Sequence, residues 1–145
     1  MKTLISIIIL ILFIVPNVIA AGSASSSPAV SKDVKIYNKG VKLMLDKKFA
    51  KAEKQFRKAL EINERFAEAH NNLAYTLRKQ GADHFDEALM NYNRAIELNP
   101  NLPEPYMYRG VLYVQMGNKS FALKDHEKLV TMGSPLADEL EYVVV

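Results

Sequence analysis

The sequence contains no cysteine, and this absence removes several classes of protein at once. Disulfide-stapled folds, zinc fingers, iron–sulfur proteins, enzymes with a cysteine nucleophile and anchors made of lipidated cysteine are all excluded. Glycine and proline are scarce, at 6 residues each, so the composition is neither collagen-like nor that of a linker. The remaining composition is ordinary for a globular protein, with 49% hydrophobic and 24% charged residues among 145. One folded domain is the expectation.

Motifs that carry chemistry are also missing. The three histidines, His70, His84 and His126, show no metal-ligand spacing, and His126 lacks the second histidine four residues later that a zinc-protease helix needs. Neither a glycine-rich phosphate loop nor a Gly-x-Ser-x-Gly elbow occurs. We therefore expect a protein that is not an enzyme, with no catalytic residue, no metal ligand and no cofactor.

Positive charge is concentrated in one part of the chain. Residues 32–66 hold 11 lysines and arginines against 5 acids, whereas residues 67–145 hold 7 against 11. Such asymmetry can steer an acidic partner or an anionic membrane toward the basic segment. The plainer interpretation, which stays open, is a solvated lysine-rich helix face.

The start of the sequence is typical of a secretory signal. A basic residue precedes an apolar run from Leu4 to Val15, and a proline and several small residues follow it. This run is too short to cross about 30 Å of hydrocarbon. We expect residues 1–20 to be a signal peptide and residues 21–32 a serine-rich spacer, so that the protein is exported, either to the periplasm or out of the cell. The alternative is an uncleaved segment, residues 4–21, that anchors the chain in a membrane.

The chain repeats itself at a regular period of about 34 residues. Four sets of residues recur in register: Gly40, Ala74 and Gly110; Ala52, Ala88 and Ala122; Phe56, Tyr92 and His126; and Ala59, Ala95 and Leu129. From the first copy to the second, the residues of the first set are closer together than those of the other three sets, and from the second copy to the third the order is reversed. The second copy therefore carries its insertion between Ala74 and Ala88. We place the insertion at residues 81–84, in a turn that tolerates it. His126 is expected to pack at the place of the aromatic ring.

Each copy contains two amphipathic stretches, such as residues 37–46 and 49–62 in the first. Small residues in the first and second stretch allow the two helices to approach closely. Because one pair cannot bury its apolar face alone, three stacked pairs are needed for a continuous core. After them, Ser134 and Pro135 are suited to begin a short helix. We predict an all-α fold, an α-α solenoid of three helix pairs with a short C-terminal capping helix.

This period and these residue types resemble the tetratricopeptide repeat. The resemblance is strongest in the middle copy, which contains Asn72-Leu73-Ala74, Gly81, Phe85-Asp86-Glu87-Ala88-Leu89 and the run from Tyr92 to Pro100. The copies correspond to residues 33–66, 67–102 and 103–134, and residues 135–145 form the capping helix and tail. The outer copies depart from the pattern, at Glu64 in the first and at His126 and Leu129 in the third.

The resemblance implies a protein–protein interaction module, a scaffold or adaptor that binds a peptide or a helix in a concave groove lined by the first helix of each pair. By register, the groove residues are Tyr37, Asn38, Val41, Met44 and Leu45; Asn71, Asn72, Tyr75, Arg78 and Lys79; and Met107, Tyr108, Val111, Val114 and Gln115. For Val41, Leu45 and Val111 the spacing does not separate groove from core. Tyr75 is expected to matter most, because it lies centrally.

Some members of the resembled family clamp the carboxylate tail of heat-shock chaperones with Lys and Asn on the first groove helix and Lys and Arg on the third. Here the corresponding places hold Tyr37, Val41, Glu104 and Tyr108, so we expect no such clamp. The expected partner is a protein or peptide and not a nucleic acid, and a membrane is expected only if the N-terminal segment is uncleaved. The alternative is a self-associating structural protein of the envelope, which forms oligomers through the open end of repeat one or the tail at residues 143–145.

Overall fold

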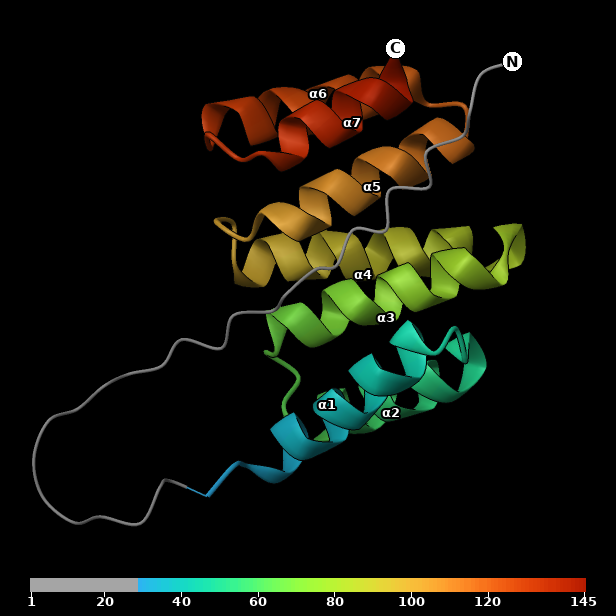
Figure 1. The fold of residues 1–145 in the computed structure, drawn as a ribbon, viewed down its shortest axis with the longest axis vertical. Coiled ribbons are helices and arrows are strands. Elements are labelled where there is room, and N and C mark those ends of the chain that lie inside the picture. Colours follow the sequence, from blue (N-terminus) through green and yellow to red (C-terminus); the bar gives the residue numbers. More distant parts are fainter. Residues whose placement is uncertain (1–28) are drawn as a thin grey trace, which may run out of the picture.

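The computed structural model describes residues 29–145, so the expected signal peptide and most of the spacer lie outside the described residues. The described part folds into helices: α1 (Lys32–Leu45), α2 (Phe49–Ile62), α3 (Ala67–Gln80), the short 3-10 turn η1 (Ala82–His84), α4 (Phe85–Leu98), α5 (Pro103–Gln115), α6 (Lys119–Thr131) and α7 (Leu136–Val144). Successive helices pair and the pairs stack in chain order, with α7 against α5 and α6 at the far end (Figure 1). The predicted solenoid with its capping helix is confirmed.

The insertion in the second copy lengthens a turn and leaves the helices intact. Helices α1, α2, α3 and α4 all contain 14 residues. Between α3 and α4 the chain passes through Gly81, with a φ of 124°, and then through η1. The shorter turns of the other pairs have a residue at positive φ as well, Lys47 in the first pair and Gly117 in the third.

The recurring small residues lie where the two helices of a pair touch. Ala52, Ala88 and Ala122 are fully buried. A Cβ atom at Gly40 would lie 2.7 Å from the ring of Phe56, so α1 and α2 can approach this closely only without a side chain there. The expectation that small residues permit close pairing is confirmed.

The third pair departs from this pattern in one respect. The atoms nearest to where a Cβ of Gly110 would lie all belong to Leu140 of α7. His126 is half-buried, and the three atoms nearest to that position do not include it, in contrast to Phe56 beside Gly40. The capping helix places a leucine there instead.

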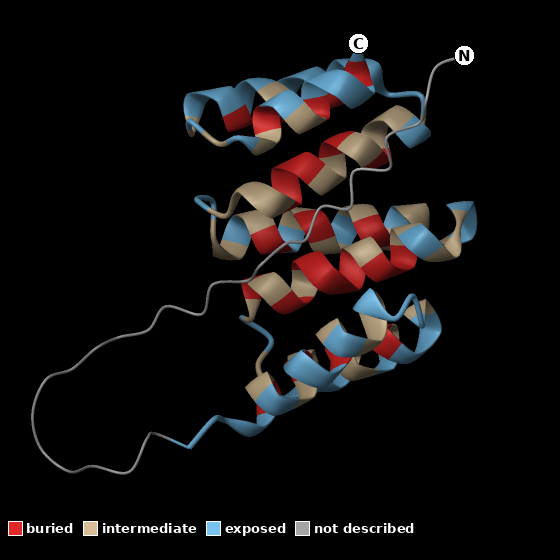
Figure 2. Ribbon diagram, in the orientation of Figure 1, coloured by how far each residue is buried: buried red, intermediate tan, exposed pale blue. Residues whose placement is uncertain are grey.

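Burial follows the order of the stack. More than half of α3 is buried, whereas only three residues of α1 are, because α3 has a helix pair on both sides (Figure 2). One apolar cluster joins the first two pairs and includes Leu112 of α5, and a second joins the third pair to α7. In residues 29–145, none of the helices is both long and apolar enough to cross a membrane.

Candidate functional site

The first helices α1, α3 and α5 follow one another along the stack and carry the residues predicted to face a partner (Figure 1). We call the surface lined by the accessible members of these predicted residues the first-helix face. The first turns of α1, α3 and α5 hold carboxylates, and the last turns of α1 and α3 hold cations. Both kinds of group sit at the favourable ends of the helix dipoles.

Four of the predicted groove residues are buried inside the stack, which corrects their placement. They are Tyr37, Asn71, Asn72 and Met107, with at most 8% of their surface exposed. Asn71 donates from Nδ2 to Oδ1 of Asn72 at 3.2 Å, and Asn72 donates from Nδ2 to the hydroxyl of Tyr37 at 2.9 Å. The bond from Asn72 ties α3 to α1, and the bond from Asn71 holds the Asn72 amide from within α3. Helical spacing places a residue on a face but does not say whether the next helix covers it.

The remaining predicted residues are accessible in differing degrees. Val41, Met44, Tyr75, Arg78, Tyr108, Val111 and Val114 are half-buried, and Asn38, Leu45, Lys79 and Gln115 are exposed. Leu45 is 69% exposed, which settles the ambiguity of its spacing in favour of the surface. Val41 and Val111 pack at the margins of the two apolar clusters.

Three aromatic rings form a line across the first-helix face, and we call Phe49, Tyr75 and Tyr108 the aromatic ridge. The ring centroids of Phe49 and Tyr75 are 6.4 Å apart, and those of Tyr75 and Tyr108 are 5.1 Å apart, both edge-to-face. This is a favourable arrangement for aromatic pairs. The ridge therefore continues from the first helix pair to the third, and Tyr75 is its centre, as its position in the middle copy suggested.

Two cations lie against the ridge. The guanidinium of Arg78 is 5.3 Å from the ring centre of Tyr75, and the ammonium of Lys79 is 5.9 Å from that of Phe49. Arg78 also donates from Nη1 to Oε1 of Gln115 at 3.2 Å, which links α3 to the end of α5. Its Nε is buried and has no hydrogen-bond partner among the described residues. Arg78 also acts on the buried hydroxyl of Tyr92, where it opposes the rise that burial causes in the pKa of that group.

Carboxylates approach the tyrosines from the first turns of α3, α5 and α7. Burial raises the pKa of Tyr108 to about 12, with Glu139 and Glu104 contributing and Arg78 opposing the shift. Burial also raises the pKa of Tyr37, and Glu68 and Glu104 add to that effect. The first-helix face accordingly has an acidic edge, formed by Glu68, Glu104 and Glu139, and a basic edge, formed by Arg78 and Lys79. One carboxylate oxygen of Glu104 is buried without a hydrogen-bond partner in the described part of the chain.

Sequence reasoning missed Phe49 and the acidic edge. Phe49 begins α2, and only first helices were searched for groove residues. An aromatic residue directly after the turn was the available signal. Glu139 lies in the first turn of α7, where the helix dipole favours an acid, and it also adds to the raised pKa of Tyr108.

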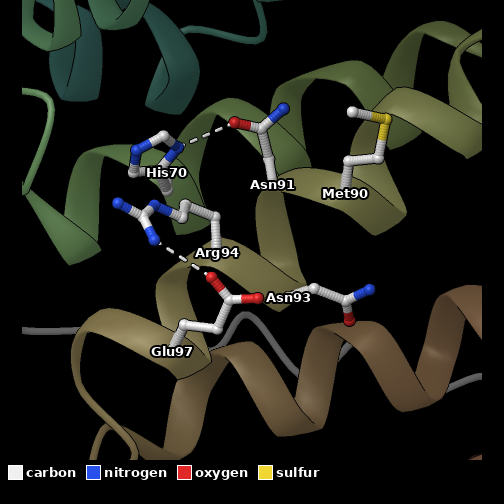
Figure 3. A pocket seen from close by; sticks show the side chains of 6 residues that line it. All are labelled: His70, Met90, Asn91, Asn93, Arg94 and Glu97. Carbon is white, nitrogen blue, oxygen red and sulfur yellow. Dashed lines mark hydrogen bonds and ion pairs between the residues drawn. The ribbon is translucent and has the colours of Figure 1, made fainter.

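Figure 3 shows a hollow in which His70 pairs with Asn91 and Arg94 pairs with Glu97. It measures about 430 Å³ and is lined by His70, Met90, Asn91, Asn93, Arg94 and Glu97. His70 Nδ1 lies 2.9 Å from Oδ1 of Asn91, and Arg94 pairs with Glu97 at 3.0 Å. These groups satisfy one another and join α3 to α4. Among residues 29–145, no cluster of three or more histidines or acids could hold a metal ion.

Comparisons with known proteins agree with the repeat pattern. A family model described as "TPR repeat" matches residues 84–117, and one described as "Tetratricopeptide repeat" matches residues 56–90. The human protein "Tetratricopeptide repeat protein 6" is 35% identical over 80 residues, which are 55% of this chain but only 15% of that protein. The chain thus spans a small part of that relative's length.

Solved structures show the same fold. The first tetratricopeptide repeat domain of Spaghetti (RPAP3), bound to an HSP90 peptide, superposes with a TM-score of 0.70, at 22% identity, over 77% of this chain and 90% of that one. The TPR2B domain of yeast Sti1 gives 0.71 at 22% identity, over 77% and 94%. The domain of Arabidopsis OM64 gives 0.70 at 19% identity, over 77% and 93%. With the matched repeats, the helix pairs and their register, the chain belongs to the tetratricopeptide repeat family.

Proposed function

We propose that this protein is a non-catalytic interaction module, a scaffold or adaptor that binds a peptide or a helix across its first-helix face. The aromatic ridge is the observation that carries the proposal. Half-buried aromatic side chains combine a large apolar body with a polar tip, and they are the commonest anchors of protein interfaces. Tyr75 and Tyr108 have this character and lie 5.1 Å apart at the centre of the face.

Two structural neighbours support a peptide or protein ligand. The Spaghetti domain is bound to the HSP90 peptide SRMEEVD, and the Sti1 domain is in a complex with pHsp70. This chain lacks the cations of the carboxylate clamp, because Tyr37 is buried and Glu104 puts a negative charge where the clamp needs a positive one. We infer a ligand other than a chaperone tail.

The charges around the ridge define the ligand more closely. A ligand that lays an apolar side chain on Tyr75 would bring one end to the acidic edge and the other to Arg78 and Lys79. Opposite charges at both ends of the ligand fit this arrangement. The half-buried guanidinium of Arg78 and the exposed ammonium of Lys79 supply donors for the acidic end of such a ligand.

The proposal can be tested with a displayed library of random peptides selected on the full chain. Binding of the selected peptides to Tyr75→Ala should weaken by about thirtyfold or more, as expected for a central hot spot of about 2 kcal/mol. The matched control is Tyr113→Ala, since Tyr113 is also half-buried on a first helix but stacks on Phe121, away from the ridge. Circular dichroism checks that both variants fold. Equal binding by wild type and Tyr75→Ala would remove the ridge as the site.

We further propose that the protein acts in the cell envelope or outside the cell. Residues 1–21 have the order of a secretory signal, and this sequence pattern is the support for the proposal. Mass spectrometry of the amino terminus in fractionated cells tests it. An intact amino terminus on a cytosolic chain contradicts export.

Self-association remains a second candidate, supported by one observation. Tyr142 and Val145 on the outer side of the capping helix are both 91% exposed. Exposed apolar side chains at the end of a stack can dock on another copy. Analytical ultracentrifugation over a concentration series distinguishes the two candidates. Association that Tyr142→Ser abolishes supports assembly, and a monomer at all concentrations supports the adaptor.

A further inference from the structure

The outer side of α1 differs from the equivalent sides of α3 and α5. The register of the repeats takes Lys35 to Ala69 and Pro105, Lys39 to Leu73 and Arg109, and Lys42 to Thr76 and Leu112. Five of these six later residues are buried, with at most 2% exposed, because the preceding helix pair lies against them. In the first copy the three lysines are exposed instead. The sequence thus puts charge at the positions where another repeat would stack.

Lys32, Lys35, Lys39 and Lys42 lie on one stripe of α1, at spacings of three, four and three residues. We call this stripe the basic end face. All four side chains are exposed, and no carboxylate in residues 29–145 forms an ion pair with any of them. Lys32 and Lys35 sit in the first turn of the helix, where the dipole disfavours a cation, and Lys42 alone sits in the last turn, where the dipole favours one. Stability of the helix therefore does not account for the stripe.

Solubility of the free end does not account for it either. Charges of mixed sign would keep the end of a stack soluble without repelling one another. The stripe instead contains one sign only, and the second helix of the pair carries further exposed lysines: Lys51, Lys54 and Lys58. A concentration of one sign raises the local potential and attracts an anionic partner.

We propose that the basic end face binds the surface of an anionic phospholipid bilayer. The stripe consists of lysines only, which act as mobile point charges and lack the planar fork that arginine uses for directional recognition of phosphate. Clusters of four to eight such charges on a helix attract anionic headgroups, by about fivefold in partition for each lysine. Val30, directly before the helix, is an exposed apolar residue next to the stripe and can enter the headgroup region.

The position of α1 in the chain agrees with this partner. Lys32 follows the apolar segment at residues 4–21 by eleven positions, which extended chain covers in about 40 Å at most. If that segment stays in the membrane, the basic end face is held near the bilayer. If it is removed, the lysines still supply the electrostatic attraction by themselves.

Lysine footprinting on vesicles tests the proposal for the full chain. The chain is mixed with vesicles of phosphatidylcholine, with or without an equal amount of phosphatidylglycerol, and amines are acylated briefly and read by peptide mass spectrometry. We expect acylation of Lys32, Lys35, Lys39 and Lys42 to slow severalfold on the anionic vesicles only, and to recover at high salt. Lys119, Lys124 and Lys128, exposed on α6, serve as internal references. Tethering through residues 4–21 would act on neutral and anionic vesicles alike, so the difference between the two vesicles reports the electrostatic attraction.

A pair of charge-matched variants sharpens the test. Lys35→Gln with Lys39→Gln and Lys42→Gln should lower the anionic protection of Lys32 by at least about tenfold. Lys119→Gln with Lys124→Gln and Lys128→Gln removes the same net charge and should leave it unchanged. Equal loss in both variants, or equal protection on neutral vesicles, would overturn the proposal. So would protection that rises with protein concentration without vesicles, which would assign the face to a second copy. Protection by a DNA duplex but not by anionic vesicles would assign it to a nucleic acid.

Discussion

In the first helix pair the ring of Phe56 lies over Gly40, whereas in the third pair Leu140 of the capping helix lies over Gly110. The two glycines occupy the same position of the repeat. In the first pair the second helix supplies its own covering side chain, and Phe56 is fully buried. In the third pair the nearest side chain comes from a later helix. The same position of the repeat is thus covered from within the pair in one case and from outside it in the other.

The same contrast holds for a charged position, since Lys39 and Arg109 occupy the same register in the first and third copies. Lys39 is exposed on the end of the stack. Arg109 donates to both carboxylate oxygens of Asp125, at 3.0 and 2.6 Å, and to Oδ1 of Asn93 at 2.7 Å. It therefore joins α4, α5 and α6. Burial raises the pKa of Asp125, while the guanidinium of Arg109 opposes the shift. The same position is exposed at the end of the stack and takes part in an ion pair where another helix pair covers it.

The largest effect is expected where the first pair loses its covering ring. Phe56→Ala should lower the free energy of unfolding by about 3–5 kcal/mol, because a buried aromatic ring is replaced by a cavity. The equivalent His126→Ala should cost less than about 1 kcal/mol, since this side chain is half-buried and does not cover Gly110. Urea denaturation measures both. Equal losses would show that His126 does carry the packing role of the ring.

The next effect concerns the ion pair of the third helix pair. Asp125→Ala should cost about 3 kcal/mol, because it leaves the guanidinium of Arg109 enclosed without its carboxylate. Replacing both, as Arg109→Leu with Asp125→Leu, should cost less than the single change, since no unpaired charge remains. The comparison variant is Arg57→Leu, whose partners Glu53 and Glu87 lie near the surface and whose loss should cost below about 1 kcal/mol. A double variant less stable than Asp125→Ala contradicts this account.

A smaller effect on stability is expected at Gly40 and Gly110, and it should differ between them because different side chains pack over the two glycines. Gly40→Ala and Gly110→Ala should each cost about 1–3 kcal/mol through overpacking. Shortening the covering side chain with Leu140→Val should recover part of the loss in Gly110→Ala and none in Gly40→Ala. Thermal melts of the single and double variants provide the measurement. If Leu140→Val fails to relieve Gly110→Ala, the capping helix is not what Gly110 accommodates.

The period of the sequence was sufficient to predict the helix pairs, their order and the close contacts at Gly40 and Ala52. These depend on local spacing and residue size, which a sequence states directly. The role of Leu140 could not be predicted, because nothing local to Gly110 shows that a helix lying beyond α6 in the chain fills the space. The register identified the ridge residues Tyr75 and Tyr108 in the same way as it identified the helices.

The register of the repeats could not predict which residues of the first helices are buried. Asn71 and Tyr75 share one side of α3, yet Asn71 is 2% exposed and Tyr75 is half-buried. Which of them a neighbouring helix covers depends on the distance and angle between helices, and the period of a sequence does not contain these. Phe49 was missed for a related reason, since it reaches the ridge from a second helix.

The smallest effect concerns the turn inside each outer pair. Lys47 has a φ of 58°, and Gly117, which holds the same position in the turn of the third pair, has a φ of 76°. A side chain in this left-handed region costs about 1–2 kcal/mol, which glycine avoids at some cost in the entropy of the unfolded chain. Lys47→Gly should therefore raise the free energy of unfolding by about 0.5–1 kcal/mol, and Gly117→Lys should lower it by about 1 kcal/mol. Lys47→Ala removes the same charge but keeps the strain, so it should leave stability nearly unchanged in urea denaturation. If Lys47→Ala stabilises as much as Lys47→Gly, relief of charge repulsion in the basic first pair, and not backbone strain, is the cause.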